Sequence, residues 1–366
     1  MIGRTKIASN SAAREVGIGP TNPNPLMPEV TLRQIAERIG CSRSTVSYAL
    51  RNSPGVSKET QDRVLEAAAE MGWRPNAELN LQMATIRKIT TSRRSPTIAV
   101  VINMAAEELK GHKAPGLQME GAKTRAEELG FQVDEFNLVD NPLSPKRLKG
   151  ILRARGIQGI VFVGTIVPPL PMEVLEVGTE FTCVVSGIRY PSLPFHVTVP
   201  DFLAAGRTAL QEIVAQGFKR PGVIISRTTD RTLNWGFSGG VFTGLMEVAE
   251  ENRLPMLFIE QDGPEETTEA WLKQHRPDCV LTLDVHHTTK TLKRLGDETP
   301  CFSMDWYPDH EVLGGMDLMQ RDIGRAAVNM VVDQLSRGEV GLPSVQHCLN
   351  VEGIWATKKQ YYESHF

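Results

Sequence analysis

Five hydrogen-bonding side chains fall within six positions of a short segment near the N-terminus. They are Arg43, Ser44, Thr45, Ser47 and Tyr48. The apolar residues between and after them recur at helical spacing, which predicts that the five polar side chains share the outer face of a helix. Arginine can donate two hydrogen bonds to the O6 and N7 atoms of guanine, and hydroxyl groups can bond to several bases. These residue types at this spacing indicate a surface that contacts base edges in a DNA groove.

Other patterns that could support chemistry are incomplete. His286 and His287 are adjacent, so they cannot share a helix face, and no third ligand follows at metal spacing. The five cysteines form no CxxC pair. The segment GFSGG at 236–240 lacks the spacings of phosphate-binding loops, and we expect it to be a flexible turn. No GxSxG elbow follows a strand. We therefore expect no metal, no cofactor and no enzymatic activity.

The polar cluster requires a small helical unit to position it. Thr31 and Gln34 form a capping-box pattern at the start of a first helix, Ser42 can cap the second, and Ser57 can cap a third. Gly40 tolerates positive φ and so permits a tight turn. The positions predicted to face inward are Leu32, Ile35, Ala36, Ile39, Val46, Ala49, Leu50, Val64, Leu65, Ala68 and Met71.

From residue 96 onward, short apolar runs such as TIAVVI, GIVFVG and GVIIS alternate with amphipathic stretches. This alternation predicts an α/β fold with parallel strands and helices on both faces of the sheet. The remaining length allows two such sheets. Ligands of open α/β sheets bind beyond the carboxyl ends of the strands, so we expect a small-molecule site between two lobes.

The charge is unevenly distributed along the 366 residues. Residues 31–94 contain 11 Lys and Arg against 6 Asp and Glu, whereas residues 95–366 contain 26 against 35. A basic N-terminal part suits binding to phosphates and predicts salt-sensitive binding. No apolar run approaches the length needed to span a bilayer, and residues 1–26 lack a hydrophobic signal core, so we expect a cytoplasmic protein. We also expect translation to start naturally at Met27.

The stretch VTLRQIAERIGCSRSTVSYALRNSPGVSKETQDRVLEAAAEMGWRPN resembles the head of the lactose-repressor and galactose-repressor family of bacterial regulators. GHKAPGLQMEGAKTRAEELG and DIGRAAVNMVVDQLSRGE are similar to the two-lobed, periplasmic-binding-protein-like core of the same repressors. The resemblance implies a transcriptional regulator, most often a repressor, that binds double-stranded operator DNA as a homodimer. Its operator affinity would be controlled by a small-molecule effector, which we expect to be a carbohydrate.

This resemblance suggests four segments. They are a disordered tail (1–29), a three-helix helix-turn-helix head (30–76), a hinge helix with linker (77–95) and the two-lobed core (96–366). In the family a leucine of the hinge wedges into the minor groove, and the matching position here is Gln82, which cannot supply an apolar wedge. Either Met83 or Leu81 acts instead, or the hinge bends DNA less. The alternative is that residues 77–95 form only a linker.

The family's DNA contacts map onto a defined set of residues. Arg43 is expected to contact guanine, with Ser44, Thr45, Ser47 and Tyr48 completing the surface. Thr31, Asn52 and Ser57 are expected to contact phosphates, and Asn76, Ala77, Gln82 and Met83 to contact DNA from the hinge. Because the family commonly has Arg where Tyr48 stands, we expect an operator that differs at the corresponding base.

Effector contacts are expected at strand ends. The candidates are Ser186, Asp284, Asp305 and Trp306, with Lys113 and the neighbouring Pro115 on the other lobe. Asp305 either accepts hydrogen bonds from vicinal hydroxyls or caps a helix or turn, and Trp306 can stack on a sugar ring. Asp201 is expected to cap a helix.

The family often has an arginine that clamps the effector, and the matching position here is Phe237. Asn234 and Trp235 are the expected substitutes, which favours a neutral effector over a carboxylated one, although Arg231 keeps that question open. Two other classes of protein remain as alternatives. A solute-binding protein would need an export signal and no basic head, and a sugar-processing enzyme with a DNA-binding head would need a catalytic constellation.

Overall fold

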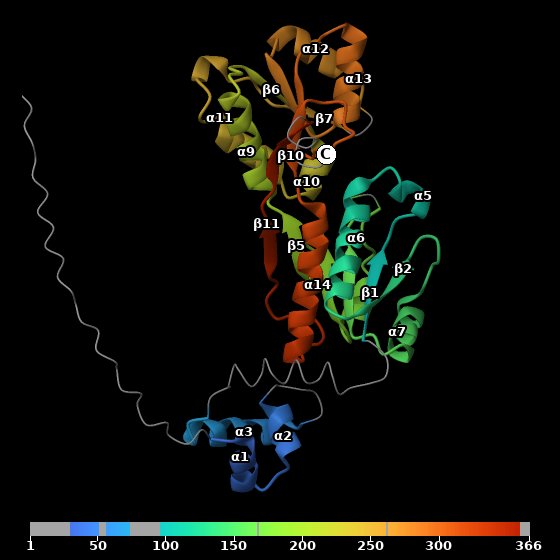
Figure 1. Cartoon of the computed structure of the whole chain (residues 1–366), viewed down its shortest axis with the longest axis vertical. Helices are drawn as coiled ribbons and strands as arrows, with labels where there is room; N and C mark the ends of the chain where they lie inside the picture. The colour runs from blue at the N-terminus through green and yellow to red at the C-terminus, as the bar shows by residue number, and fades with distance from the viewer. Residues whose placement is uncertain (1–29, 51–55, 74–95, 167, 261–262, 359–366) are drawn as a thin grey trace, which may run out of the picture. The chain divides into compact units, whose positions relative to one another are not determined.

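The computed structural model describes residues 30–50, 56–73, 96–166, 168–260 and 263–358 (Figure 1). The chain divides into two units, Met1–Ile86 and Arg87–Phe366. We call the described part of the first unit the head and that of the second unit the core. None of the helices in the described ranges is long and apolar enough to cross a membrane.

The head contains three helices, each begun by a side-chain cap. Thr31 and Gln34 form the predicted capping box, Ser42 accepts from the Thr45 amide, and Ser57 accepts from the Thr60 amide. These oxygens satisfy amide groups that have no partner within the first helical turn. The helices are α1 (Leu32–Ile39), α2 (Arg43–Ala49) and α3 (Lys58–Glu70).

The hydrophobic interior of the head is small and almost entirely aliphatic. Gly40 ends α1 at φ 69°, as predicted, and this left-handed turn brings α2 back across α1. The prediction that Leu65 faces inward is wrong, because 45% of Leu65 is exposed and Ala67 is buried on α3 instead. The buried residues are Ile35, Ala36, Val46, Ala49, Val64, Ala67 and Ala68.

The core contains two six-stranded sheets, as the alternation of apolar runs predicted. Sheet A has the order β11-β5-β4-β3-β1-β2, and all its strand pairs are parallel. Its strands are β1 (Thr97–Ile102), β2 (Gln132–Asn137), β3 (Gly159–Val163), β4 (Thr182–Ser186), β5 (His196–Pro200) and β11 (Cys348–Val351).

Both faces of sheet A are covered by helices, which explains why its central strands are continuously apolar. Ala99 and Val101 of β1 pack toward α7 and α8, whereas Ile98 and Val100 pack toward α6 and α14. The associated helices are α5 (Ala106–Leu109), α6 (Lys113–Glu128), α7 (Pro145–Ala154), α8 (Val174–Gly178) and α14 (Gln320–Arg337).

Sheet B has the order β12-β10-β9-β8-β6-β7 and is parallel except for β12, which runs antiparallel to β10. Its strands are β6 (Pro221–Ser226), β7 (Leu257–Ile259), β8 (Cys279–Thr282), β9 (Cys301–Ser303), β10 (Gly314–Asp317) and β12 (Ile354–Thr357).

Sheet B is covered on both faces as well. Val223 and Ile225 of β6 pack toward α9 and α11, and Ile224 packs toward α12 and α13. The helices are α9 (Phe202–Ala215), α10 (Arg227–Thr232), α11 (Gly236–Leu245), α12 (Glu265–His275) and α13 (Val285–Leu295), with a 3₁₀ turn at Glu250–Asn252.

The chain passes between the two lobes three times. It leaves sheet A after β5, returns from β10 into α14, which packs on sheet A, and crosses again from β11 to β12 (Figure 1). Phe202 and Leu233 pack against the cores of both lobes near the first crossing. The lobes are therefore joined by three short connections.

The prediction that GFSGG forms a flexible turn is wrong, because residues 236–240 begin helix α11. Gly236 and Gly240 serve packing against α9. A Cβ atom on Gly240 would lie 2.1 Å from the Leu203 carbonyl oxygen of α9. Gly240 thus allows α9 and α11 to approach more closely than a side chain would permit.

Candidate DNA-binding head and effector site

The outer face of α2 carries the side chains that the sequence singled out. Arg43, Ser44 and Tyr48 are exposed, and Thr45 and Ser47 are half-buried. The opposite face of the helix is held in the core by Val46 and Ala49. The five polar residues therefore share one surface of the head, with 54% of Tyr48 exposed.

Hydrogen bonds fix the start of this helix. The Ser42 hydroxyl lies 2.6 Å from the Ser44 hydroxyl and 2.8 Å from the Thr45 hydroxyl. It also accepts from the Thr45 amide at 3.1 Å. This network restrains the first turn of α2, where a recognition helix presents its side chains to bases.

The expected phosphate contacts sit at helix starts. Thr31 and Ser57 are exposed caps of α1 and α3, with the hydroxyl of Ser57 2.8 Å from that of Thr60. The amino end of a helix carries partial positive charge, which suits an approaching phosphate. Five of the expected DNA contacts lie outside the described residues. These are Asn52, Asn76, Ala77, Gln82 and Met83.

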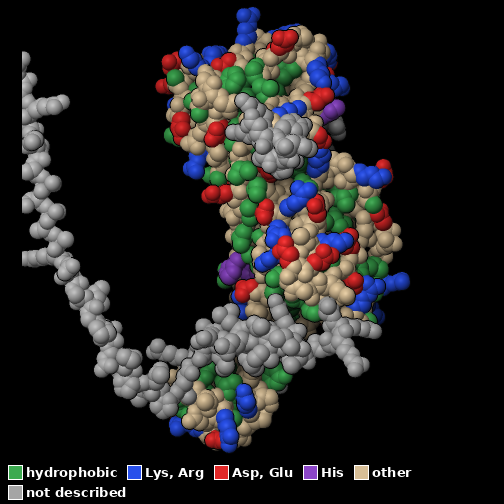
Figure 2. Space-filling view, in the orientation of Figure 1, with side chains coloured by type: hydrophobic (Ala, Val, Ile, Leu, Met, Phe, Trp, Pro, Cys, Tyr) green, Lys and Arg blue, Asp and Glu red, His purple; other side chains and the backbone are tan. Residues whose placement is uncertain are grey.

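Charge on the head is partly paired. Arg33 pairs with Glu37 at 2.8 Å, and Arg38 of α1 pairs with Glu70 of α3 at 2.6 Å. On the face shown in Figure 2, Lys and Arg side chains outnumber Asp and Glu on the head, while the two signs are interspersed on the core. Counted over the whole described head, five Lys and Arg are balanced by five Asp and Glu, so the basic excess of residues 31–94 belongs to positions outside the described residues.

In the core, Asp305 follows the carboxyl end of β9, as predicted. Its Oδ2 atom accepts a hydrogen bond from the Tyr307 hydroxyl at 3.2 Å, whereas its buried Oδ1 atom has no hydrogen-bond partner among the described residues. Burial raises the pKa of this carboxyl to about 7. The side chain caps no described helix. A buried acceptor without a partner is costly, and a hydroxyl-bearing ligand would satisfy it.

Lys113 reaches the same segment from the other lobe. It begins α6, forms an ion pair with Asp309, and its Nζ lies 5.4 Å from the centre of the Tyr307 ring. The hydrogen bond and charge of Lys113 lower the pKa of Asp309. The structure thus brings Lys113 and the segment that contains Asp305 together, across the boundary between the lobes.

Ser186 ends β4 in the lobe built on sheet A, which we call the first lobe, and is fully buried. The lobe built on sheet B is the second lobe. Its hydroxyl donates to the Oε1 atom of Gln118 at 3.0 Å. The Gln118 amide in turn contacts Gln320 at the start of α14. Ser186 is therefore part of a buried polar network, and a ligand would reach it only through these partners.

The predicted sugar-stacking role of Trp306 is wrong. Only 2% of Trp306 is exposed, and it belongs to the apolar layer that contains Ile224, Trp271 and Leu292. Burying an indole in this layer contributes on the order of 2 kcal/mol, which outweighs any partial exposure for a ligand. Trp306 follows Asp305 directly in the sequence, but its indole ring does not lie on the same side as the Asp305 carboxyl group.

Asn234 and Trp235 occupy an unusual turn between α10 and α11. Both have left-handed backbone conformations, at φ 58° and 57°, and 42% of Trp235 is exposed. The buried Asp230 side chain fixes the turn by accepting from the amides of Phe237 and Ser238 at 3.1 and 3.3 Å. Left-handed conformations of residues other than glycine cost energy and concentrate at ligand sites.

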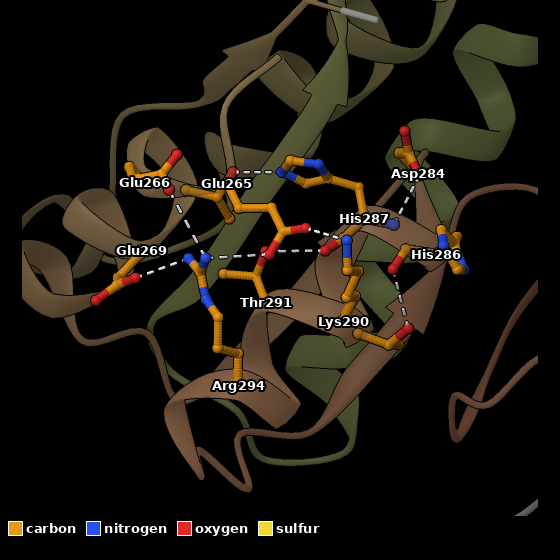
Figure 3. Close-up of polar contacts among 11 residues, drawn as sticks. Glu265, Glu266, Glu269, Asp284, His286, His287, Lys290, Thr291 and Arg294 are labelled. Carbon is orange, nitrogen blue, oxygen red and sulfur yellow. Dashed lines mark hydrogen bonds and ion pairs between the residues drawn. The ribbon is translucent and has the colours of Figure 1, made fainter. Parts of the chain in front are cut away.

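Asp284 follows β8 but its carboxylate is engaged by the protein. It caps α13 by accepting from the His287 amide at 3.0 Å (Figure 3). His287 bonds to Thr268 of α12 at 2.8 Å and is directed away from His286. The described residues contain no group of three potential metal ligands. Asp201 also caps a helix, as predicted, by accepting from Ala204.

A shallow depression of about 690 Å³ lies elsewhere, between α13 and the loop before β10. Its lining includes Thr289, Lys293, Glu311 and Lys358, and none of the predicted effector residues. It is open to solvent and holds no buried unpaired polar atom, so the surroundings of Asp305 are the stronger candidate for the effector site.

Three residues at the effector site were missed in the sequence. Tyr307, Gln118 and Gln320 meet only because α6, α14 and the end of β9 converge. Tyr307 lies two residues after Asp305, and this spacing was the one available signal. Nothing in the sequence indicated that two glutamines separated by 202 positions would face each other.

Comparisons with known proteins agree with this geometry. Residues 31–76 match the family model described as bacterial regulatory proteins, lacI family. The HTH-type transcriptional regulator DegA of Bacillus subtilis is 24% identical over 261 residues, covering 70% of this chain and 73% of DegA. CelR of Thermobifida fusca is 26% identical over 197 residues, covering 53% and 55% of the two chains.

Solved structures show the same fold. The complex of the transcriptional regulator CelR with cellobiose has a TM-score of 0.53 at 20% identity, covering 91% of this chain and all of the other. The lac repressor dimer bound to operator and the anti-inducer ONPF has a TM-score of 0.51 at 19% identity, covering 91% and 99%. The helix-turn-helix head and the two-lobed core define a DNA-binding transcriptional regulator. The head, through residues 31–76, matches the lacI family of bacterial regulatory proteins.

Proposed function

We propose that this regulator is a repressor that binds a pseudo-palindromic operator as a homodimer and is controlled by a neutral carbohydrate held between the lobes. The observation that carries the proposal is the exposed polar face of α2, within the segment that matches the family. Arg43 contacts guanine, and Ser44, Thr45, Ser47 and Tyr48 complete the recognition surface. A regulator of this kind acts in the bacterial cytoplasm.

The effector site is built around Asp305. Its unpartnered Oδ1 atom suits a hydroxyl donor, and the exposed indole of Trp235 offers an apolar face to a sugar ring. Phe237, at the position of the family's arginine clamp, is 1% exposed and lies in the core of the second lobe. The absence of that clamp favours a neutral ligand. A solved relative, CelR, is bound to cellobiose, which makes cellobiose the first sugar to test.

Control by the effector requires that it bind one arrangement of the lobes more tightly than the other. The difference between its two affinities sets the regulatory range, and operator DNA changes effector affinity by the same factor. The contacts of Lys113 with Asp309 and Tyr307 join the lobes at the effector site, so they are the contacts that lobe movement would alter first.

The test is a titration of the full-length protein on a fluorescent library of palindromic DNA, at two salt concentrations, with and without cellobiose and a panel of other neutral sugars. Salt-sensitive, sequence-selective binding that one sugar shifts is the expected result. Selective binding that no sugar shifts would retain the regulator and reject the carbohydrate effector. Sugar binding without selective DNA binding would identify a solute-binding protein instead.

A further inference from the structure

Two buried glutamine side chains meet where the lobes are joined. Gln118 of α6 and Gln320 of α14 are 3% and 6% exposed, and the Nε2 atom of Gln118 donates to the Oε1 atom of Gln320 at 2.7 Å. Gln118 also accepts from Ser186 through its Oε1 atom at 3.0 Å. A Cβ atom on Gly187 would lie 2.5 Å from the Gln118 amide, so this amide has little room to rotate.

The position of Gln320 in the fold is unusual. It is the first residue of α14, three positions after β10 ends in sheet B, while α14 itself packs on sheet A. The preceding Met319 has φ 54°, a left-handed conformation in the connection between the lobes. Gln320 is therefore attached to both lobes, and any change in the angle of this crossing moves its side chain.

Helices α6 and α14 are fixed to each other around the same glutamine. A Cβ atom on Gly324 would lie 2.0 Å from the Gln118 carbonyl oxygen, and one on Gly121 would lie 2.0 Å from the Arg321 carbonyl oxygen. The two backbones are thus in direct contact. A displacement of Gln320 is transmitted to α6 because the helices cannot slide past each other without separating.

The connection that leads into Gln320 is also bonded to the segment that carries Asp305. Because the Gln320 oxygen already accepts from Gln118, its NH₂ group remains to donate. The Trp306 amide, next to Asp305 in the chain, donates to the Met316 carbonyl of β10 at 2.7 Å, four residues before Gln320. Tyr307 donates to Asp305 in turn. A chain of polar groups therefore runs from Ser186 through Gln118 to Gln320, and β10 connects Gln320 to the segment that carries Asp305.

We propose that Gln118 and Gln320 are positioning residues that transmit occupancy of the effector site at Asp305 to helix α6 and the first lobe. The proposal rests on the proposed effector function. When a ligand hydroxyl bonds to Asp305, it pulls on the segment that carries this residue and, through the hydrogen bond from Trp306 to Met316, on β10 and Gln320. Buried amides keep their partners, so the Gln320 adjustment is followed by Gln118 and α6 rather than absorbed locally.

The test compares three isosteric substitutions of buried glutamines, each made in the full-length protein. Gln118→Met and Gln320→Met interrupt the chain of polar groups. Gln334→Met is the matched control, because Gln334 is also 6% exposed on α14 but donates to the Met330 carbonyl within its own helix. Circular dichroism and operator affinity without sugar verify that each variant folds.

The measured quantity is the ratio of operator Kd values with and without the sugar that is active on the unaltered protein, cellobiose being tried first. Calorimetry sets the sugar concentration that saturates each variant, and at that concentration we expect the ratio to fall at least threefold toward one in Gln118→Met and Gln320→Met. Gln334→Met should retain the full ratio. Unchanged ratios in the first two variants, or an equal loss in all three, would overturn the proposal.

A second measurement needs no sugar and therefore separates failure of this proposal from failure of the proposed function. Operator affinity is measured for Asp305→Asn, Gln118→Met and the double variant, and the same cycle is repeated with Gln334→Met. If two substitutions act independently, the fold-change in operator Kd of the double variant equals the product of the two single fold-changes. We expect the double variant of Asp305→Asn and Gln118→Met to differ from this product by at least twofold. The double variant of Asp305→Asn and Gln334→Met should equal it. Independent effects in the first cycle would contradict coupling between Asp305 and α6, whatever the sugar result.

Discussion

At the scale of single residues, the carboxyl group of Asp305 gives the clearest dependence on pH. Burial raises its pKa from 3.8 to about 7. The folded protein therefore holds this proton more tightly than the unfolded chain does. The resulting contribution to stability is complete below about pH 4 and is lost as the pH rises through about 7.

We predict that Asp305→Asn, which cannot ionise, removes this dependence. Relative to the variant, the unaltered protein should lose free energy of unfolding between pH 4 and 8, by an amount on the order of 4 kcal/mol at most. Urea unfolding followed by tryptophan fluorescence across this range measures the difference. Parallel pH profiles for the two proteins would contradict the raised pKa of Asp305.

Arg43 supports a second prediction at this scale. Its side chain is exposed at the first position of α2, and Arg43→Ala should weaken operator binding by about 1–3 kcal/mol and relax the preference at one base pair. Arg33→Ala is the control, because Arg33 is exposed on α1 and paired with Glu37. That control should change affinity by less than about 0.5 kcal/mol. Affinity and preference are measured with single-base variants of the selected operator.

At the scale of elements, the contact between α6 and α14 depends on glycine. A Cβ atom on Gly121 would lie 2.0 Å from the Arg321 carbonyl oxygen, whereas one on Gly116 of the same helix would meet nothing within 4 Å. We predict that Gly121→Ala destabilises the core by about 1–3 kcal/mol, while Gly116→Ala stabilises it by roughly 0.5–1 kcal/mol through helix propensity. Thermal unfolding of the two variants tests this, and equal effects would show that the helices can separate freely.

Elements whose signals are local could be predicted from the sequence. Thr31, Ser42 and Ser57 cap the three head helices, and Asp201 caps α9, because a cap needs only a side chain and the next turn of the helix. The apolar runs became the strands of both sheets for a similar reason, since burial on both faces requires continuous apolar residues.

The predictions that were wrong concern features that depend on tertiary packing. Glycines 239 and 240 resemble a turn in sequence, yet both lie in α11, and Gly240 is where α9 approaches that helix closely. Trp306 is adjacent to Asp305 but faces the opposite layer of the core. The Gln118–Gln320 contact joins positions too distant for any periodicity to reveal. The candidate effector site includes such contacts, so the sequence indicated residues at strand ends but not how they are connected.

At the scale of the whole molecule, the uneven charge determines how binding responds to salt. The formal net charge is −3, although residues 31–94 carry an excess of five basic side chains. The acidic core repels DNA, so affinity depends on contacts between the head and phosphates. Such binding releases counterions and weakens steeply with salt, by about 10³-fold or more between 50 and 200 mM when six or more phosphates are contacted.

We expect a single lysine, Lys58, to account for part of the dependence of DNA affinity on salt concentration. Lys58 is exposed at the first position of α3, beside the cap Ser57, whereas Lys273 pairs with Glu269 on α12 of the core. Each substitution to Gln removes one positive charge from the molecule. If the head alone contacts phosphates, Lys58→Gln lowers the slope of log affinity against log salt by about 1, and Lys273→Gln leaves it unchanged. Equal changes in slope would mean that DNA responds to the total charge of the protein rather than to contacts made by the head.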